Sequence, residues 1–113
     1  MLSVLENIIT NGINAMPNGG NLTISTSMAS DLQLPNNTEK HVDCLVLEIM
    51  DTGIGIPKEL IDKIFLPFST NTHLGTGLGL MIVKKIIDDH QGFIEVNSEV
   101  NVGTSFIIYL PVA

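Results

Sequence analysis

Two glycine-rich segments constrain this chain more than any other feature of its sequence. The first, residues 51–56 (Asp-Thr-Gly-Ile-Gly-Ile), directly follows an apolar segment with strand character. The second, residues 75–79 (Gly-Thr-Gly-Leu-Gly), directly precedes an amphipathic helical segment. Closely spaced glycines let backbone approach a ligand without a Cβ clash, and a helix N-terminus attracts phosphate. The pair predicts an α/β domain with a phosphate-containing ligand, although residues 75–79 alone also fit a flexible loop.

Single positions exclude two common nucleotide-binding motifs. No Gly-Lys-Ser or Gly-Lys-Thr occurs, so the chain contains no P-loop. A dinucleotide-binding fingerprint that starts at Gly75 would need glycine at position 80, which is Leu80. One that starts at Gly53 would need glycine at position 58, which is Lys58. A nucleotide site in this chain must therefore use another architecture.

The composition is that of one small acidic domain. Its 113 residues, 44% of them apolar, support one modest core. The net charge of -7 and the absence of arginine argue against binding to nucleic acid and to anionic membranes. A single cysteine, Cys44, excludes an internal disulfide framework. Because neither a membrane-spanning run nor a signal-peptide pattern is evident, we expect a cytoplasmic domain.

Hydrophobic periodicity predicts helices interspersed with strands. In residues 1–16, one helical stripe holds Leu2, Leu5, Ile9, Gly12 and Met16. Residues 29–42, which include Pro-Asn-Asn, have the composition of a polar loop. The remaining predicted elements are strands at 22–28, 44–50, 93–97 and 104–110 and helices at 57–64 and 78–90, the last ending at Gly92 as a C-terminal cap. Together they predict a helix-on-sheet sandwich.

Asp51 stands at the end of an apolar strand. A carboxylate only accepts hydrogen bonds, so in a pocket it would suit the exocyclic amine of adenine, which guanine does not present at that position. The alternative is an ordinary turn-forming Asp before Thr-Gly. The continuation to Gly55, Ile56 and Pro57 makes the segment more specific than Asp-Thr-Gly alone.

Three asparagines form a second stripe along the first helix. Asn is a poor helix former, so Asn7, Asn11 and Asn14 on one face have a cost. An amide oxygen suits Mg²⁺, and Asn11 at the middle of the stripe is the natural ligand. Two alternatives remain: the asparagine face is solvated, or Asn11-Gly12 is a hairpin turn.

The ordered motifs closely resemble the catalytic ATP-binding domain of bacterial sensor histidine kinases, in the superfamily shared with gyrase, MutL and heat-shock chaperone ATPases. Residues 7–15 resemble its N box, 51–56 its G1 box, 65–68 its F box and 75–80 its G2 box. Gly-Thr-Ser-Phe at 103–106 and Leu-Pro at 110–111 resemble its closing strand. The motifs follow the family order across residues 1–113, so we expect a single domain.

The resemblance implies a two-layer α/β sandwich whose mixed sheet is covered on one face by helices. ATP would lie between the helices and a lid at residues 69–76. Asp51 would bind the adenine amine, Thr104 would lie below the ring, and Asn11 and Asn7 would hold Mg²⁺. The other nucleotide-binding positions implied by the motifs are Asn14, Ala15, Gly53, Gly55, Ile56, Gly75, Thr76, Gly77, Leu78 and Gly79.

The resemblance also implies a function. The domain would donate the γ-phosphate of ATP to a histidine on a separate dimerisation domain, in cis or in trans, with a response regulator downstream. The full protein would be dimeric and could be anchored in the inner membrane. No histidine here precedes Asp or Glu as a phosphoacceptor does, and the chain begins inside the N box, so we expect a truncated domain without its first strand.

Two alternatives to this function remain. One is a degenerate or truncated nucleotide-binding module that acts through a partner without kinase activity, which the absence of arginine favours. The other is an anti-sigma type serine kinase, which would carry an acidic residue at position 7. Asn7 also stands where gyrase-like members have a glutamate base, which favours phosphotransfer over ATP hydrolysis.

Overall fold

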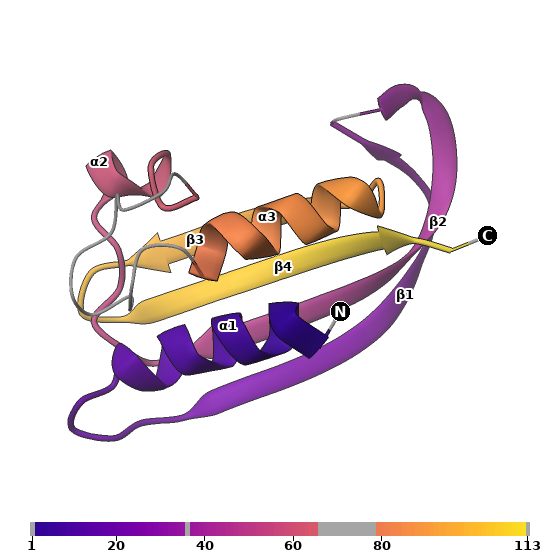
Figure 1. Cartoon of the computed structure of the whole chain (residues 1–113). Coiled ribbons are helices and arrows are strands. Elements are labelled where there is room, and N and C mark those ends of the chain that lie inside the picture. The colour runs from indigo at the N-terminus through magenta and orange to yellow at the C-terminus, as the bar shows by residue number, and fades with distance from the viewer. Residues whose placement is uncertain (1, 36, 66–78, 113) are drawn as a thin grey trace.

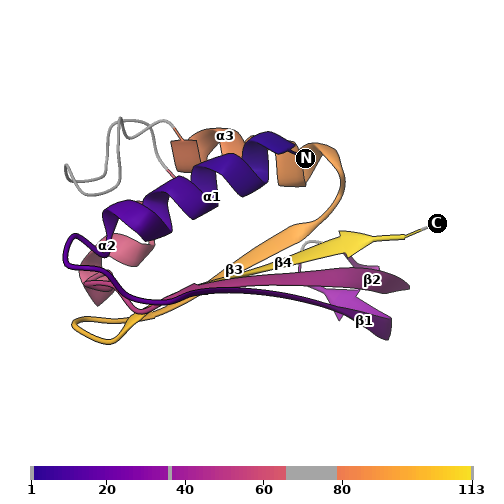
Figure 2. The ribbon, with the colours of Figure 1, turned by 90° about the horizontal axis from the view of Figure 1, so that it is seen from below.

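The computed structural model describes residues 2–35, 37–65 and 79–112. Two helices, α1 (Leu2–Asn14) and α3 (Gly79–Asp89), lie side by side and antiparallel over one face of a four-stranded sheet (Figures 1 and 2). The other elements are β1 (Leu22–Leu34), β2 (Asn37–Asp51), the short α2 (Lys58–Ile61), β3 (Phe93–Glu99) and β4 (Gly103–Pro111). The predicted two-layer α/β sandwich is therefore confirmed. None of the described helices is long and apolar enough to cross a membrane.

The sheet has the strand order β1-β2-β4-β3, and each neighbouring pair is antiparallel. The predicted mixed sheet is thus wrong for the described strands, which contain no parallel pair. Two tight connections explain most of this, because β1–β2 and β3–β4 are hairpins and short hairpins join antiparallel strands. In this register Asp51 at the end of β2 lies opposite Leu22 of β1 and Thr104 of β4.

The predicted loop at residues 29–42 is wrong, since most of it belongs to the β1–β2 hairpin, which curls beyond the helices (Figure 1). Leu34 pairs with Asn37 at the closed end of this hairpin. Leu34 is 5% exposed, which gives the polar segment an apolar anchor. The register shifts near Asp31, whose φ is 57° and whose N–H donates to Asp43 Oδ1 at 2.9 Å. A bulge of this kind tolerates residues typical of loops.

Aliphatic side chains from both layers fill the core. The helix-facing rows alternate along the strands, as in Leu47 and Ile49 of β2 and Phe106 and Ile108 of β4. In and just after α1 the buried positions are Val4, Ile8, Asn11, Gly12 and Ala15, of which Gly12 belongs to the predicted stripe and the others precede its members by one position. On α3 they are Leu80, Val83 and Ile87. The asparagine stripe therefore borders the core side of α1.

The C-terminal end of α3 is held by backbone hydrogen bonds. Gly92 N–H donates to Ile87 O at 2.9 Å and Gln91 N–H to Asp88 O at 2.9 Å, the pattern of a Schellman motif. The left-handed residue is Gln91, with φ 59°, and not the predicted Gly92. A Cβ on Gly92 would lie 2.5 Å from Tyr109 O, so glycine serves close packing there.

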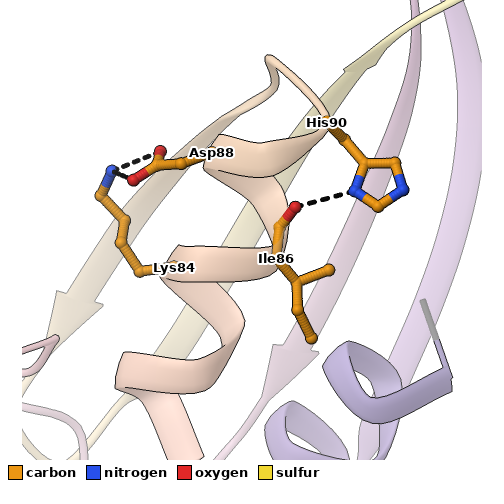
Figure 3. Close-up of polar contacts among 4 residues, drawn as sticks. All are labelled: Lys84, Ile86, Asp88 and His90. Carbon is orange, nitrogen blue, oxygen red and sulfur yellow. Dashed lines mark hydrogen bonds and ion pairs between the residues drawn. The ribbon is translucent and has the colours of Figure 1, made fainter.

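Side chains add to this end of α3 (Figure 3). His90 Nδ1 lies 2.8 Å from the carbonyl oxygen of Ile86, to which its Nδ1–H tautomer donates. Lys84 Nζ contacts both carboxylate oxygens of Asp88, at 2.7 and 2.8 Å. The Lys84–Asp88 pair is half exposed, so its contribution to stability is small.

Candidate functional site

Several predicted site residues gather where the helices meet one end of the sheet. The C-terminal end of α1, the first turn of α3 and the end of β2 lie at the same end of the sandwich (Figures 1 and 2). The register places Thr104 of β4 beside Asp51, with both side chains on the helix-covered face. The fold thus brings together Asn11, Asp51 and Thr104, which are 93 positions apart at most in the sequence.

Asp51 forms a buried acceptor at this end of the sheet. The residue is 6% exposed, and its Oδ1 accepts a hydrogen bond from Gly53 N–H at 2.8 Å. Burial raises the pKa of its carboxyl above the ordinary value, while the amides of Gly53 and Thr104 act in the opposite direction. Helix α1 passes close by, since a Cβ on Gly12 would lie 3.6 Å from Asp51 Oδ2. The predicted role of Asp51 as a pocket acceptor is consistent with this burial.

Thr104 is joined to the loop after β2 by a residue that the sequence did not suggest. Ser98 of β3 has its Oγ 2.7 Å from Thr104 Oγ1. The same oxygen accepts from Ile56 N–H at 2.7 Å and donates to Gly103 O at 3.1 Å. No local signal pointed to Ser98, which follows the predicted strand at 93–97. Its helix-facing position opposite Thr104, where a polar side chain needs a partner, comes from the register of the hairpin.

Close packing against neighbouring backbone requires glycine at positions 53 and 55, independently of any contact with a ligand. A Cβ on Gly53 would lie 2.5 Å from Ala15 O, at the end of α1. Gly55 has φ +75°, and a Cβ there would overlap the carbonyl oxygen of Glu99. Between them, Ile54 N–H donates to Ala15 O at 3.0 Å and Ile54 O accepts from Asn101 N–H at 2.8 Å. Residues 53–55 thus connect α1 to the β3–β4 turn.

Asn11 carries an unusual polar group. It is 6% exposed, and its Nδ2 has no hydrogen-bond partner among the described residues. An unpaired buried amide costs free energy, so it points to a ligand. Rotation of the amide by 180° exchanges nitrogen and oxygen, so this position can also present the oxygen that Mg²⁺ prefers. Because Asn11 lies in a helix and is buried, the hairpin-turn and solvated-face alternatives are both wrong for it.

The two other asparagines differ from Asn11. Asn7 Nδ2 donates to Ser3 O at 2.7 Å, which leaves Oδ1 for another partner. That oxygen faces the start of α3, since a Cβ on Gly79 would lie 2.8 Å from it. Asn14 ends α1 and is exposed, which fits the solvated-face alternative for this position.

Part of the predicted site lies outside the described residues. This concerns residues 66–68 of the F box, the lid at 69–76, and Gly75, Thr76, Gly77 and Leu78 of the G2 box. Phe65 packs against the core, as does the buried Leu80 of α3. In the described ranges no group of three or more His, Cys, Asp and Glu side chains could hold a metal ion.

Comparison with known proteins identifies the class of this domain. The family model of histidine kinase-, DNA gyrase B- and HSP90-like ATPases matches residues 1–113, and the chain belongs to this family. Within it, the similarity is to histidine kinases. The catalytic domain of histidine kinase ThkA is 35% identical with a TM-score of 0.73, over 96% of this chain and 63% of that chain. The mycobacterial sensor histidine kinase MprB is 26% identical with a TM-score of 0.76, over 96% and 70%.

Curated relatives support the same assignment. Sporulation kinase D of Bacillus subtilis is 41% identical over 110 residues, which are 97% of this chain and 19% of that protein. Sensory histidine kinase/phosphatase NtrB of Salmonella typhimurium is 39% identical over 110 residues, 96% of this chain and 31% of that protein. The chain thus spans less than a third of these relatives. The predicted family is confirmed: this is an ATP-binding domain of the histidine kinase type.

Proposed function

We propose that this domain binds Mg-ATP and presents the γ-phosphate to a histidine on a separate dimerisation domain. The observation that carries the proposal is the pairing of two buried polar groups at one end of the sandwich. Asp51 offers acceptors in a buried wall, and Asn11 has an amide without a partner among the described residues. One group suits the base of a nucleotide and the other suits its metal-bound phosphates.

Base recognition would depend on Asp51. Its carboxylate can accept from the exocyclic amine of adenine, whereas a 6-oxo purine would bring an oxygen against it. Thr104 lies beside Asp51 on β4 and adds a hydroxyl to the same wall. Gly53, Gly55 and Ile56 form the loop next to this wall, and Ala15 supports that loop from α1.

The phosphates and the metal would lie between α1 and the start of α3. Asn11 and Asn7 would hold Mg²⁺ through their amide oxygens, and the metal, when bound, offsets the charge of the phosphates. Gly79 begins α3 next to Asn7 and gives the helix N-terminus access to the phosphates. The remaining phosphate-binding positions that we propose are Asn14, Gly75, Thr76, Gly77 and Leu78.

Phosphotransfer in this proposal rests on positioning rather than on a protein nucleophile. The bond between the γ-phosphorus and the bridging oxygen of ATP would break and ADP would leave. The unprotonated nitrogen of the acceptor imidazole would bond to phosphorus, and the other ring nitrogen would release its proton to solvent. Asn7 has no basic carboxylate for activating water, in keeping with a histidine acceptor. A response regulator would then take the phosphoryl group from that histidine.

Titration calorimetry tests base recognition. We expect Asp51→Asn to weaken ATP binding about 10- to 100-fold, because hydrogen bonds to a charged group contribute about 1.5–3 kcal/mol. Asp43→Asn is the matched control: it makes the same change on the same strand, but Asp43 is exposed and bonds Asp31 N–H far from the site. Equal ATP affinities for the wild type and Asp51→Asn would refute the adenine assignment.

Magnesium and transfer need separate tests. We expect ATP affinity to fall when EDTA removes magnesium. Asn11→Ala should abolish that difference, while the exposed Asn97→Ala should retain it.

Phosphotransfer is tested with radiolabelled ATP and a histidine kinase dimerisation domain supplied in trans. Magnesium-dependent binding without any labelled histidine would favour the alternative, a nucleotide-binding module without kinase activity.

A further inference from the structure

We propose that Ser98 is a positioning residue that orients the hydroxyl group of Thr104 and thereby sets the choice between 6-amino and 6-oxo purines. The inference rests on the proposed binding of ATP at Asp51. Ser98 lies on β3, one strand beyond Thr104, and its Oγ is surrounded by three hydrogen-bonding partners. The proposal follows from counting the protons that Ser98 Oγ and its three partners can donate.

The donors and acceptors around Ser98 can be assigned one by one. A serine hydroxyl has one proton to donate and two lone pairs to accept with. Ile56 N–H is a donor only, so it occupies one lone pair of Ser98 Oγ at 2.7 Å. Gly103 O is an acceptor only, so the contact at 3.1 Å requires the proton of Ser98. Ser98 then has no proton left for Thr104.

Thr104 must therefore donate to Ser98 if all three contacts are hydrogen bonds. The distance between the two side-chain oxygens is 2.7 Å, which is typical of an O–H···O bond. With its proton committed, Thr104 Oγ1 has only lone pairs for other partners. Asp51 beside it is an acceptor as well, so both groups present acceptors on this wall.

An acceptor-only wall selects the group at position 6 of a purine. An amine has two protons to donate, directly or through water, whereas a 6-oxo group is an acceptor with none. If Ser98 is removed, the Thr104 hydroxyl can rotate and donate its proton to a 6-oxo group. We therefore expect Ser98→Ala to relax the discrimination of the site without any direct contact between Ser98 and the base.

Calorimetric titration with ATP and inosine triphosphate measures this discrimination. We expect the preference of the wild type for ATP, expressed as the ratio of the two dissociation constants, to fall about fivefold to tenfold in Ser98→Ala, the effect of one hydrogen bond. Ser98→Thr retains the hydroxyl and should retain the ratio. Ser105→Ala removes a serine hydroxyl that bonds Glu48 on the opposite face of the sheet and should also retain it.

A second variant separates orientation from general destabilisation. In Thr104→Val, which has no hydroxyl to orient, Ser98→Ala should change the ratio no further, so the two effects are strongly non-additive. If Ser98→Ala does not fold, Ser98→Cys fills the same space with a weaker donor and acceptor and should lower the ratio as well. Melting temperatures identify variants that are unfolded.

Two results would overturn the proposal in distinguishable ways. If the wild type prefers ATP and folded Ser98→Ala or Ser98→Cys keeps the same ratio, Ser98 has only a structural role and the proposed ATP site stands. If the wild type binds ATP and inosine triphosphate equally, or neither, the adenine assignment of Asp51 fails together with this inference.

Discussion

Gly55 offers the sharpest test of how the loop after β2 is built. Its backbone has φ +75°, a conformation that residues with a Cβ rarely adopt, and a Cβ would also overlap the Glu99 carbonyl oxygen. Gly19 has a similar backbone, φ +89°, but a Cβ there would meet no atom within 4 Å. Gly19→Ala and Gly55→Ala should therefore have the same cost for a left-handed backbone, but only Gly55→Ala adds an overlap with another backbone atom.

The magnitudes follow from these two environments. Gly19→Ala should cost only the left-handed backbone penalty, about 1 kcal/mol. Gly55→Ala adds overlap with backbone that no rotamer change relieves, about 1–3 kcal/mol, and strains the bond from Asn101 N–H to Ile54 O, about 1 kcal/mol more. We expect a loss of about 3–5 kcal/mol, a large share of the roughly 5–15 kcal/mol of a typical domain.

Urea unfolding followed by circular dichroism measures both variants. At about 4 °C per kcal/mol, thermal melts should show a midpoint lowered by more than about 10 °C for Gly55→Ala and by about 4 °C for Gly19→Ala. Equal losses of stability in the two variants would refute the account, because they would mean that the Glu99 turn moves aside without cost.

Three further outcomes are expected. Gln91→Gly should raise the free energy of unfolding by about 1 kcal/mol, since Gln91 has a left-handed backbone at the end of α3; a thermal melt without any gain would contradict this. Lys84→Ala should cost less than about 0.5 kcal/mol, and a double-mutant cycle with Asp88→Ala that gives more than about 1 kcal/mol would show the half-exposed pair to be stronger than its geometry suggests. Burial raises the native pKa of Asp51 above its ordinary value of 3.8, so at pH values between 3.8 and the native pKa the folded state binds more protons than the unfolded state. The wild type should therefore gain stability relative to Asp51→Asn as the pH falls from 7 toward this range. Urea unfolding at pH 7 and pH 5 checks the sign, and a relative loss for the wild type at pH 5 would contradict it.

The sequence predicts most of the fold because the apolar periodicity and the positions of the glycines indicate the same boundaries for the helices and strands. The helix at 78–90 and the hairpin after Gly92 are found within a few residues of their predicted ends. The strand character of residues 29–42 was not predictable from local composition, since Pro35 and Asp31 are typical of loops. The strand that contains Asp31 depends on pairing between β1 and β2, an interaction between distant residues that overrides local preference.

In the candidate site, too, some residues could be identified from the sequence and others only from the structure. Asp51 and Asn11 could be selected from the sequence because the motifs that contain them, residues 51–56 and 7–15, follow the order of a known family. Ser98 could not, since serine in a polar hairpin is common and its importance lies in three partners that only the register brings together. Similarly, the packing roles of Gly53 and Gly55 depend on Ala15 and Glu99, which are distant in the sequence.

The backbone of Ile54 has a consequence for the energetics of ligand binding. One hydrogen bond ties it to the end of α1 and another to the β3–β4 turn, so the loop next to Asp51 is immobilised when the chain folds. The conformational entropy of ordering that loop is lost during folding and does not have to be lost again when a nucleotide arrives. In the proposed site, the loop beside Asp51 is therefore preorganised before any ligand binds. Variants that loosen Ile54 should therefore bind the same base with a larger entropic penalty, even where every contacting side chain is retained.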